Sequence, residues 1–193
     1  MTDPALPPHA AGPAVPLTEE VRAAVTFQSY AAPPRIADVV LRPVRKHRAE
    51  NGWFAELLRL SDGAADALPA GVSLTVRQLS ASHAAPGRIN AFHVHPKRGQ
   101  NELWTVLQGQ LLVWLVDCRA ESPTGGVRQR VLLSGEEPAQ LYIPAGVAHG
   151  YRAGAEGALL VYAMDQQFEA ADPDEGRLPW DHFGAELWEE DRG

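Results

Sequence analysis

One stretch of the sequence decides the fold that we predict: Gly87-Arg88-Ile89-Asn90-Ala91-Phe92-His93-Val94-His95, then Pro96 to Asn101, then Glu102. On a β-strand alternate side chains share a face, so His93 and His95 point the same way. Glu102 opens the next apolar run, Leu103 to Leu107. If the two runs pair as a hairpin, two imidazoles and one carboxylate converge on one spot.

A third imidazole comes from a later turn, Pro144-Ala145-Gly146-Val147-Ala148-His149. Three imidazoles and one carboxylate form a donor set that suits a first-row divalent metal. We therefore predict one metal ion, which is manganese, iron, cobalt, nickel, copper or zinc, with the ligands His93, His95, Glu102 and His149. Taken singly, each residue has a simpler interpretation, such as a half-exposed strand histidine or a solvated glutamate.

The order and spacing of these residues resemble the two signature motifs of the cupin superfamily. The first motif is Gly87, five residues, His-x-His, a loop, Glu102, six residues and Gly109, and the second is the Pro-x-Gly-x-x-His of residues 144–149. The loop before Glu102 is longer than is usual for the superfamily, and Ala153 stands where the family has Asn. The resemblance implies an all-β fold, the cupin jelly-roll β-barrel with a central cavity.

The rest of the chain favours the same fold class, because many short strand candidates alternate with turn residues. The candidates are residues 36–44, 72–79, 89–95, 102–107, 110–116, 128–133, 139–143, 150–152 and 158–164, with a further strand starting at Glu50. A short N-terminal helix runs from the N-cap Thr18 to about Val25. Residues 169–182 form a loop over the barrel, and Trp188 anchors a short C-terminal helix. Residues 1–16 are a flexible arm, and residues 17–193 are a single domain.

Composition narrows the function classes. The 193 residues carry a net charge of −7 and hold one cysteine, Cys118, so an internal disulfide is excluded. A basic surface for nucleic acid is not expected, because the only basic cluster is Arg42 to Arg48. The sequence has neither a secretory start nor an apolar run near the length of a membrane span, so we expect a cytoplasmic protein without a membrane partner.

A narrower resemblance covers about residues 37 to 188. Four segments are similar to those of the dTDP-4-dehydrorhamnose 3,5-epimerases: residues 50–56; residues 116–119 with 122–124; residues 140–151; and residues 173–176 with 180–181. The resemblance implies a metal-free homodimer that exchanges N-terminal strands. It also implies a His base oriented by an Asp, a Lys that stabilises an enolate, a Tyr that returns the proton, and arginines on a nucleotide diphosphate.

The chain departs from that pattern at most of these roles. His93 matches the catalytic His, but His95 replaces a Gln and Glu102 lies at or beside the position of the Lys. Other departures are Asn90 for an Arg, Phe168 for the acid Tyr, and Asp191 as the nearest candidate for the orienting Asp. These changes remove acid–base groups and add metal ligands. Tyr162 matches another cavity tyrosine and is a candidate proton donor, although a core tyrosine is the simpler interpretation.

We therefore predict a metal-dependent isomerase or epimerase that acts on a keto sugar or a nucleotide sugar. An imidazole bound to a metal is not a free base, so His93 is catalytic only if the protein is metal-free. Three alternatives stay open at this point: a metal-dependent cupin dioxygenase, a metal-free 3,5-epimerase with His93 as base, and a non-enzymatic ligand-binding cupin.

Overall fold

The computed structural model describes residues 12–66, 68 and 72–190. By its internal contacts the chain divides into two units, Met1–Ala32 and Pro33–Gly193. The first unit contains the predicted helix, α1 (Glu19–Ala24), and the side chain of Thr18 caps it by accepting a hydrogen bond from the backbone N–H of Val21 at 3.4 Å. The first eleven residues of the predicted arm lie outside the described residues, and its boundary at residue 16 stays a prediction.

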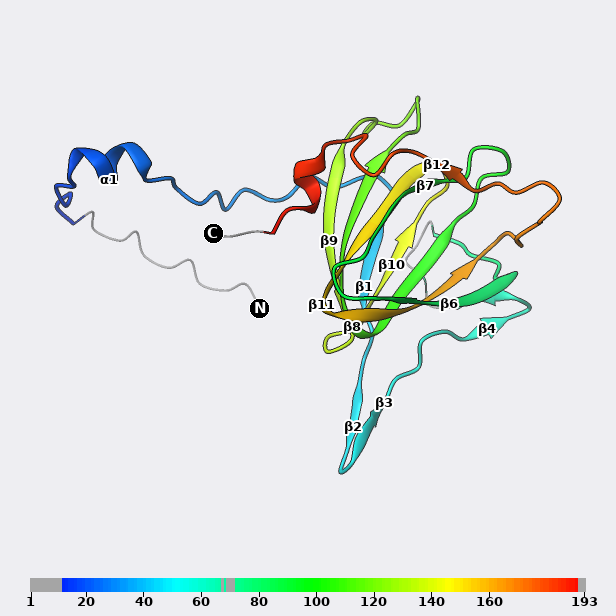
Figure 1. Cartoon of the computed structure of the whole chain (residues 1–193). Coiled ribbons are helices and arrows are strands. Elements are labelled where there is room, and N and C mark those ends of the chain that lie inside the picture. The colour runs from blue at the N-terminus through cyan, green and yellow to red at the C-terminus, as the bar shows by residue number, and fades with distance from the viewer. Residues whose placement is uncertain (1–11, 67, 69–71, 191–193) are drawn as a thin grey trace. The chain divides into compact units, whose positions relative to one another are not determined.

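The second unit is an antiparallel jelly roll whose strands curve into a barrel (Figure 1). Its main sheet has eight strands in the order β1-β10-β8-β11-β7-β12, with β6 paired to β11 and β9 paired to β8. They are β1 (Val40–Pro43), β6 (Gln78–Ala84), β7 (Ile89–Val94), β8 (Glu102–Asp117), β9 (Arg128–Ser134), β10 (Ala139–Ile143), β11 (Val147–Met164) and β12 (Gly176–Arg177). The predicted all-β cupin jelly roll is confirmed.

Two small hairpins and a short helix complete this unit. The hairpins are β2 (His47–Ala49) with β3 (Gly52–Phe54), and β4 (Leu60–Ser61) with β5 (Ala64–Ala65). The C-terminal helix η1 (Ala185–Trp188) is a short 3₁₀ helix that contains Trp188, in agreement with the short helix predicted there. No helix within the described residues has the length and apolar character needed to cross a membrane.

β8 and β11 are each longer than predicted, because each joins two of the predicted strands: residues 102–107 and 110–116 in β8, and residues 150–152 and 158–164 in β11. β8 continues through Gly109, and β11 continues through Gly157. Both glycines have positive φ, and a Cβ at Gly109 would lie 2.0 Å from the carbonyl oxygen of Gly157. The glycines therefore allow two strands to cross closely at a bulge, where the register of β11 on β8 shifts.

The predicted hairpin between the two motif strands is wrong. β7 pairs with β11 and β12 and does not pair with β8, because β11 lies between β7 and β8 in the sheet. In the β11–β7 register His149 faces His93, and in the β11–β8 register Met164 faces Glu102. The curvature of β11 around the barrel, and not a local turn, brings the motif residues to one cavity.

The C-terminal tail fixes the strand that carries His93. Phe92 of β7 is fully buried. The centre of its ring lies 5.3 Å from the ring centre of Trp188 and 5.0 Å from that of Phe183. Burying one phenylalanine contributes about 2 kcal/mol. The tail therefore holds the backbone of β7 against the barrel next to the residue that faces the cavity.

Candidate active site

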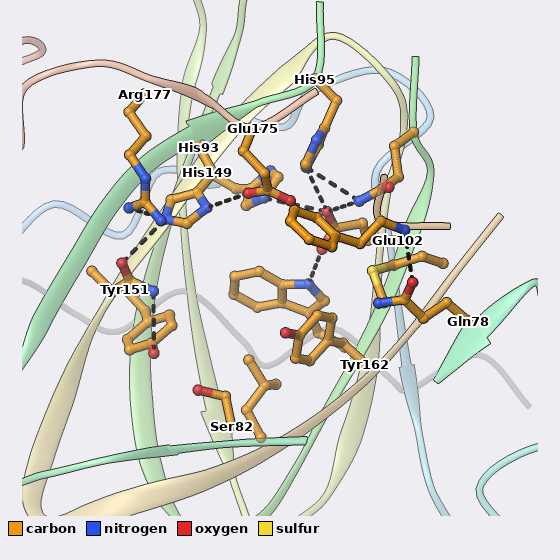
Figure 2. Close-up of a pocket in the computed structure, with 16 residues that line it drawn as sticks. Gln78, Ser82, His93, His95, Glu102, His149, Tyr151, Tyr162, Glu175 and Arg177 are labelled. Carbon is orange, nitrogen blue, oxygen red and sulfur yellow. Dashed lines mark hydrogen bonds and ion pairs between the residues drawn. The ribbon is translucent and has the colours of Figure 1, made fainter. Parts of the chain in front are cut away.

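The barrel encloses a cavity of ≈ 330 Å³ into which the motif residues point (Figure 2). Its lining combines strands β6, β7, β8, β11 and β12 with the connection between β7 and β8 and the segment between β11 and β12. The lining residues are Gln78, Ser82, Asn90, His93, His95, Gln100, Glu102, Trp104, His149, Tyr151, Leu160, Tyr162, Met164, Phe168, Glu175 and Arg177. The volume is at the lower end of the range for small-molecule sites and is large enough for a sugar ring.

Three of the four predicted metal ligands lie together, and all three are buried. Potential ligand atoms of His95, Glu102 and His149 lie within 4.8 Å of one another. Glu102 accepts hydrogen bonds on both carboxylate oxygens, from His95 Nε2 at 2.9 Å and from Trp104 Nε1 at 2.6 Å. Burial opposes the ionised carboxylate, but the neighbouring histidines and these hydrogen bonds outweigh burial and lower the pKa of Glu102 to about 2.

His95 and His149 are held in different protonation states. The two ring nitrogens of His95 face acceptors, the carbonyl oxygen of Asp174 and the carboxylate of Glu102, so both nitrogens carry hydrogen. Burial disfavours that cation, yet its bonds to Glu102 raise the pKa of His95 overall. His149 donates from Nδ1 to the carbonyl oxygen of Val147 at 3.1 Å, and burial lowers its pKa. The buried group is therefore an imidazolium–carboxylate pair beside a neutral imidazole.

His93 stands apart from this group and contacts a different set of side chains (Figure 2). Its Nε2 lies 2.9 Å from Arg177 Nη1, and its Nδ1 lies 3.6 Å from a carboxylate oxygen of Glu175. A guanidinium can only donate, so Nε2 of His93 is the unprotonated nitrogen and Nδ1 carries the hydrogen. The atom of Asn90 that lies 3.1 Å from Nε2 is Oδ1, which cannot donate, so this tautomer requires the Asn90 amide to be turned with its nitrogen towards the ring.

The environment of His93 keeps its ring neutral. Burial is the largest cause, and together with the positive charge of Arg177 it lowers the pKa of His93 to about 4. At neutral pH the residue is therefore an unprotonated imidazole whose Nε2 carries a lone pair. Such a group can remove a proton from a bound molecule.

Two charged residues of this site, Glu175 and Arg177, escaped the sequence analysis. They lie in the stretch predicted to be a loop over the barrel, where β12 instead pairs with β7 and places Arg177 opposite His93. The only signal was the similarity of residues 173–176 to the closing segment of the epimerases. Asp191, the predicted orienting carboxylate, lies outside the described residues, and Glu175 places a carboxylate beside His93 in the structure.

Tyr162 lines the same cavity from β11, where it pairs with Ser80 of β6 and Trp104 of β8. Burial, reinforced by the charge of Glu102, raises its pKa, so the hydroxyl keeps its proton at neutral pH. Phe168 lines the cavity entrance with 61% of its surface exposed. The cavity therefore offers the neutral imidazole of His93 as a proton acceptor and the phenol of Tyr162 as a proton donor.

The family model described as dTDP-4-dehydrorhamnose 3,5-epimerase matches residues 33–187. The spore coat polysaccharide biosynthesis protein SpsL of Bacillus subtilis is 36% identical over 147 residues, which are 76% of this chain and 91% of SpsL. The chain therefore aligns with nearly the whole length of a protein of polysaccharide synthesis.

Solved structures give the same family. A dTDP sugar isomerase from Desulfovibrio desulfuricans is 26% identical with a TM-score of 0.65, and covers 81% of this chain and 91% of its own. A 3,5-epimerase from Legionella pneumophila was solved in complex with dTDP-4-keto-L-rhamnose. It is 25% identical with a TM-score of 0.63, and the match covers 76% of this chain and 75% of the Legionella chain. The prediction of a sugar epimerase or isomerase is confirmed, and the dioxygenase and non-enzymatic alternatives are not favoured.

The predicted divalent metal cofactor is wrong. Epimerases of the matched family act without a metal ion. The contacts give a physical reason why the four side chains do not act as a ligand set: Glu102 is already neutralised by His95, and the lone pair of His93 accepts a hydrogen bond from Arg177. A cation bound there would have to displace one positive group and lie close to another. The metal-dependent reaction that we predicted from the motif is therefore not supported.

Proposed function

Since the chain belongs to the dTDP-4-dehydrorhamnose 3,5-epimerase family, we propose that it inverts a carbon next to the keto group of a nucleotide-linked sugar, with His93 as the catalytic base. The observation that carries the proposal is the state of His93. It is a neutral imidazole, faces the cavity, and has an unprotonated Nε2. A proton next to a carbonyl is the kind of proton that such a base removes.

The reaction needs one proton to leave and one to return. Nε2 of His93 takes the proton from the carbon, and the electrons of the broken C–H bond move to the carbonyl oxygen to form an enolate. Inversion follows when a proton returns to the same carbon from the opposite face, and no oxidant or metal is required. Glu175 beside Nδ1 stabilises the imidazolium that His93 becomes after it has taken the proton.

Tyr162 is the residue that we assign to return the proton. Figure 2 shows Tyr162 and His93 on different walls of the cavity, and the two belong to β11 and β7. The raised pKa of Tyr162 keeps it protonated before the reaction. A phenol of this kind is a suitable general acid towards an enolate.

The substrate class is supported by the relatives. One was solved with dTDP-4-keto-L-rhamnose, a nucleotide-linked keto sugar, and another is a dTDP sugar isomerase. The cavity volume of ≈ 330 Å³ accommodates one sugar ring beside the histidine. The cytoplasmic location stays a prediction.

We also propose that the protein is a homodimer, as the resemblance to the epimerases implies. A second, mainly apolar groove of ≈ 450 Å³ is bordered by Phe54, Leu60 and Leu79, whose side chains are 65%, 48% and 66% exposed. Exposed apolar surface that is gathered around one groove marks an interaction site more often than scattered single residues do.

Solvent exchange tests the catalytic proposal. The purified protein is incubated in D₂O with dTDP-4-keto-6-deoxyglucose, and ¹H NMR follows the protons on the two carbons that flank the keto group. We expect deuterium to enter at one or both carbons at a rate that depends on enzyme concentration. If the wild-type protein gives no exchange with this sugar or with its UDP-linked counterpart, the proposed function does not hold.

A further inference from the structure

Arg177 covers the atom that acts as the base. β12 pairs with β7 so that Arg177 lies directly opposite His93, and Nη1 donates to Nε2 at 2.9 Å. This nitrogen carries the lone pair that takes the proton in the proposed reaction. A lone pair that accepts a hydrogen bond from a guanidinium is not available to a C–H bond, so the base is capped in the structure.

Arg177 is a cation without an anionic partner. Within the described residues, its guanidinium forms no ion pair with a carboxylate, and its bond to His93 uses a neutral ring. The other cation lining the cavity, His95, is neutralised by Glu102. Most N–H donors of Arg177 are thus available to an anion, and Arg177 is an exposed residue.

A third groove, distinct from the catalytic cavity and from the apolar groove at Phe54, is bordered by Arg177. Its volume is ≈ 550 Å³, and its border includes Ile89, Pro179 and Trp180 together with Asn90 and Arg177, which also line the catalytic cavity. The groove and the cavity therefore adjoin at these two residues. Trp180 leaves 48% of its surface exposed, while its carbonyl oxygen is held by Trp188 Nε1 at 2.8 Å.

The groove is thus lined by both a guanidinium and an accessible indole, and it adjoins a cavity sized for a sugar. A phosphate fits the guanidinium because Arg binds phosphate oxygens through parallel, charge-assisted hydrogen bonds. A nucleobase fits the indole because aromatic rings stack on one another. A nucleoside diphosphate linked to a sugar has these groups in the required order.

Substrates of the matched family carry a nucleoside diphosphate. We propose that Arg177, at the border of this groove, binds the phosphates, and that this contact withdraws the guanidinium from Nε2 of His93. The base then becomes free only when a diphosphate-linked sugar is bound. The gating part of the proposal rests on the proposed role of His93. The binding part does not.

The exchange of partners is favourable on charge alone. A guanidinium gains more from a phosphate than from a neutral imidazole, because the phosphate brings a negative charge and can accept two parallel hydrogen bonds from the same guanidinium. The same exchange explains how the enzyme would reject a free keto sugar. Without the diphosphate, Arg177 stays on His93.

Calorimetric titration with dTDP and with thymidine tests the binding part. We expect R177Q to weaken dTDP binding at least tenfold, with no matching effect on thymidine, and R177K to lie between R177Q and the wild type. The matched control is R128Q, since Arg128 is an exposed arginine on β9 whose guanidinium lies 3.8 Å from Glu186. Unchanged dTDP affinity in R177Q, with thermal melting that shows a folded protein, overturns the proposal.

The ¹⁵N NMR signal of His93 Nε2 tests the gating part. Addition of dTDP to the wild type should shift this signal to where it already lies in free R177Q, and dTDP should move it little further in that variant. An unshifted signal in the wild type at saturating dTDP contradicts the gate.

The two proposals fail in different ways. If R177Q binds dTDP as the wild type does and still exchanges substrate protons at the full rate, the gate is wrong and the epimerase stands. If dTDP binding depends on Arg177 but no keto sugar exchanges protons in the wild type, the epimerase is wrong and the nucleotide groove stands.

Discussion

The rings of His93 and His149 lie 6.1 Å apart on neighbouring strands, paired across the β11–β7 ladder, but their nitrogens have different partners. His149 is buried and donates to its own turn, at the carbonyl oxygen of Val147. His93 faces Arg177 and Glu175 on the open side of the cavity. One histidine is thus a fixed part of the barrel wall, and the other lies among charged side chains that also line the cavity.

Replacement of His93 by asparagine should abolish catalysis without unfolding the protein. Asparagine has no group that accepts a proton near neutral pH, and removing a general base typically lowers a rate by about 10² to 10⁴. The measurement is the rate of deuterium entry next to the keto group, with thermal melting as the check on folding. H83Q, which alters an exposed histidine on β6, is the matched control and should keep the wild-type rate. Exchange at the wild-type rate in H93N would show that another group is the base.

The pH dependence of kcat/KM should reflect the lowered pKa of His93, which is about 4. The neutral ring is the active form, so activity should be level from about pH 6 to 8 and fall only as the pH approaches that pKa. Loss of the positive charge in R177Q should raise the pKa of His93 and move the acid limb to higher pH. An acid limb centred at the ordinary histidine pKa in the wild type would contradict the burial argument.

The sequence contained enough to predict the barrel and the position of its cavity. His93, His95, Glu102 and His149 were predicted to converge because their spacing and order match two motifs, and His95, Glu102 and His149 do lie within 4.8 Å. Their chemistry was not predictable in this way. A spacing pattern specifies which side chains meet, but not that His95 is protonated by its two acceptors or that His93 accepts from Arg177.

Arg177 illustrates the limit. It lies 84 positions from His93 in a polar, proline-containing stretch, where no periodic pattern predicts a strand. Its contact arises because β12 adds to the edge of β7. The hairpin between β7 and β8 was mispredicted for a related reason, since pairing with a distant strand, β11, replaced pairing with the nearest one.

Removal of metals should leave the activity unchanged. The buried His95–Glu102 pair satisfies its own charge, so no cation is needed to keep the carboxylate ionised. Untagged protein dialysed against a chelator should exchange substrate protons at its original rate. The same rate is expected after addition of manganese, iron, cobalt, nickel, copper or zinc. A loss of activity on dialysis that one of these ions restores would contradict this prediction.

The apolar groove at Phe54 and Leu79 should be covered by a second copy of the chain. Light scattering coupled to size-exclusion chromatography should give twice the mass of one chain, which is 20.9 kDa. F54E places a charge on a side chain that is 65% exposed, so it should produce a folded monomer. F168E, at another exposed phenylalanine, should leave the mass unchanged. A monomeric wild type would leave the groove without this partner.

Replacement of Glu102 by glutamine should destabilise the fold, even though the two side chains have nearly the same size and shape. His95 and Glu102 are 6% and 4% exposed, and removing one partner of such a buried pair costs about 3 to 5 kcal/mol. The pKa of Glu102 is lowered in the folded state, so its stabilising effect is complete above the ordinary glutamate pKa and declines as the pH falls towards about 2. Urea unfolding of the wild type should therefore show stability falling below about pH 4.5.

The variants separate this pair from other carboxylates. E102Q should be less stable than the wild type at pH 7 and should lose less stability on acidification, while E121Q, at an exposed residue, should behave as the wild type does. Equal losses in E102Q and the wild type between pH 7 and pH 3 would mean that this pair does not set the acid stability of the barrel.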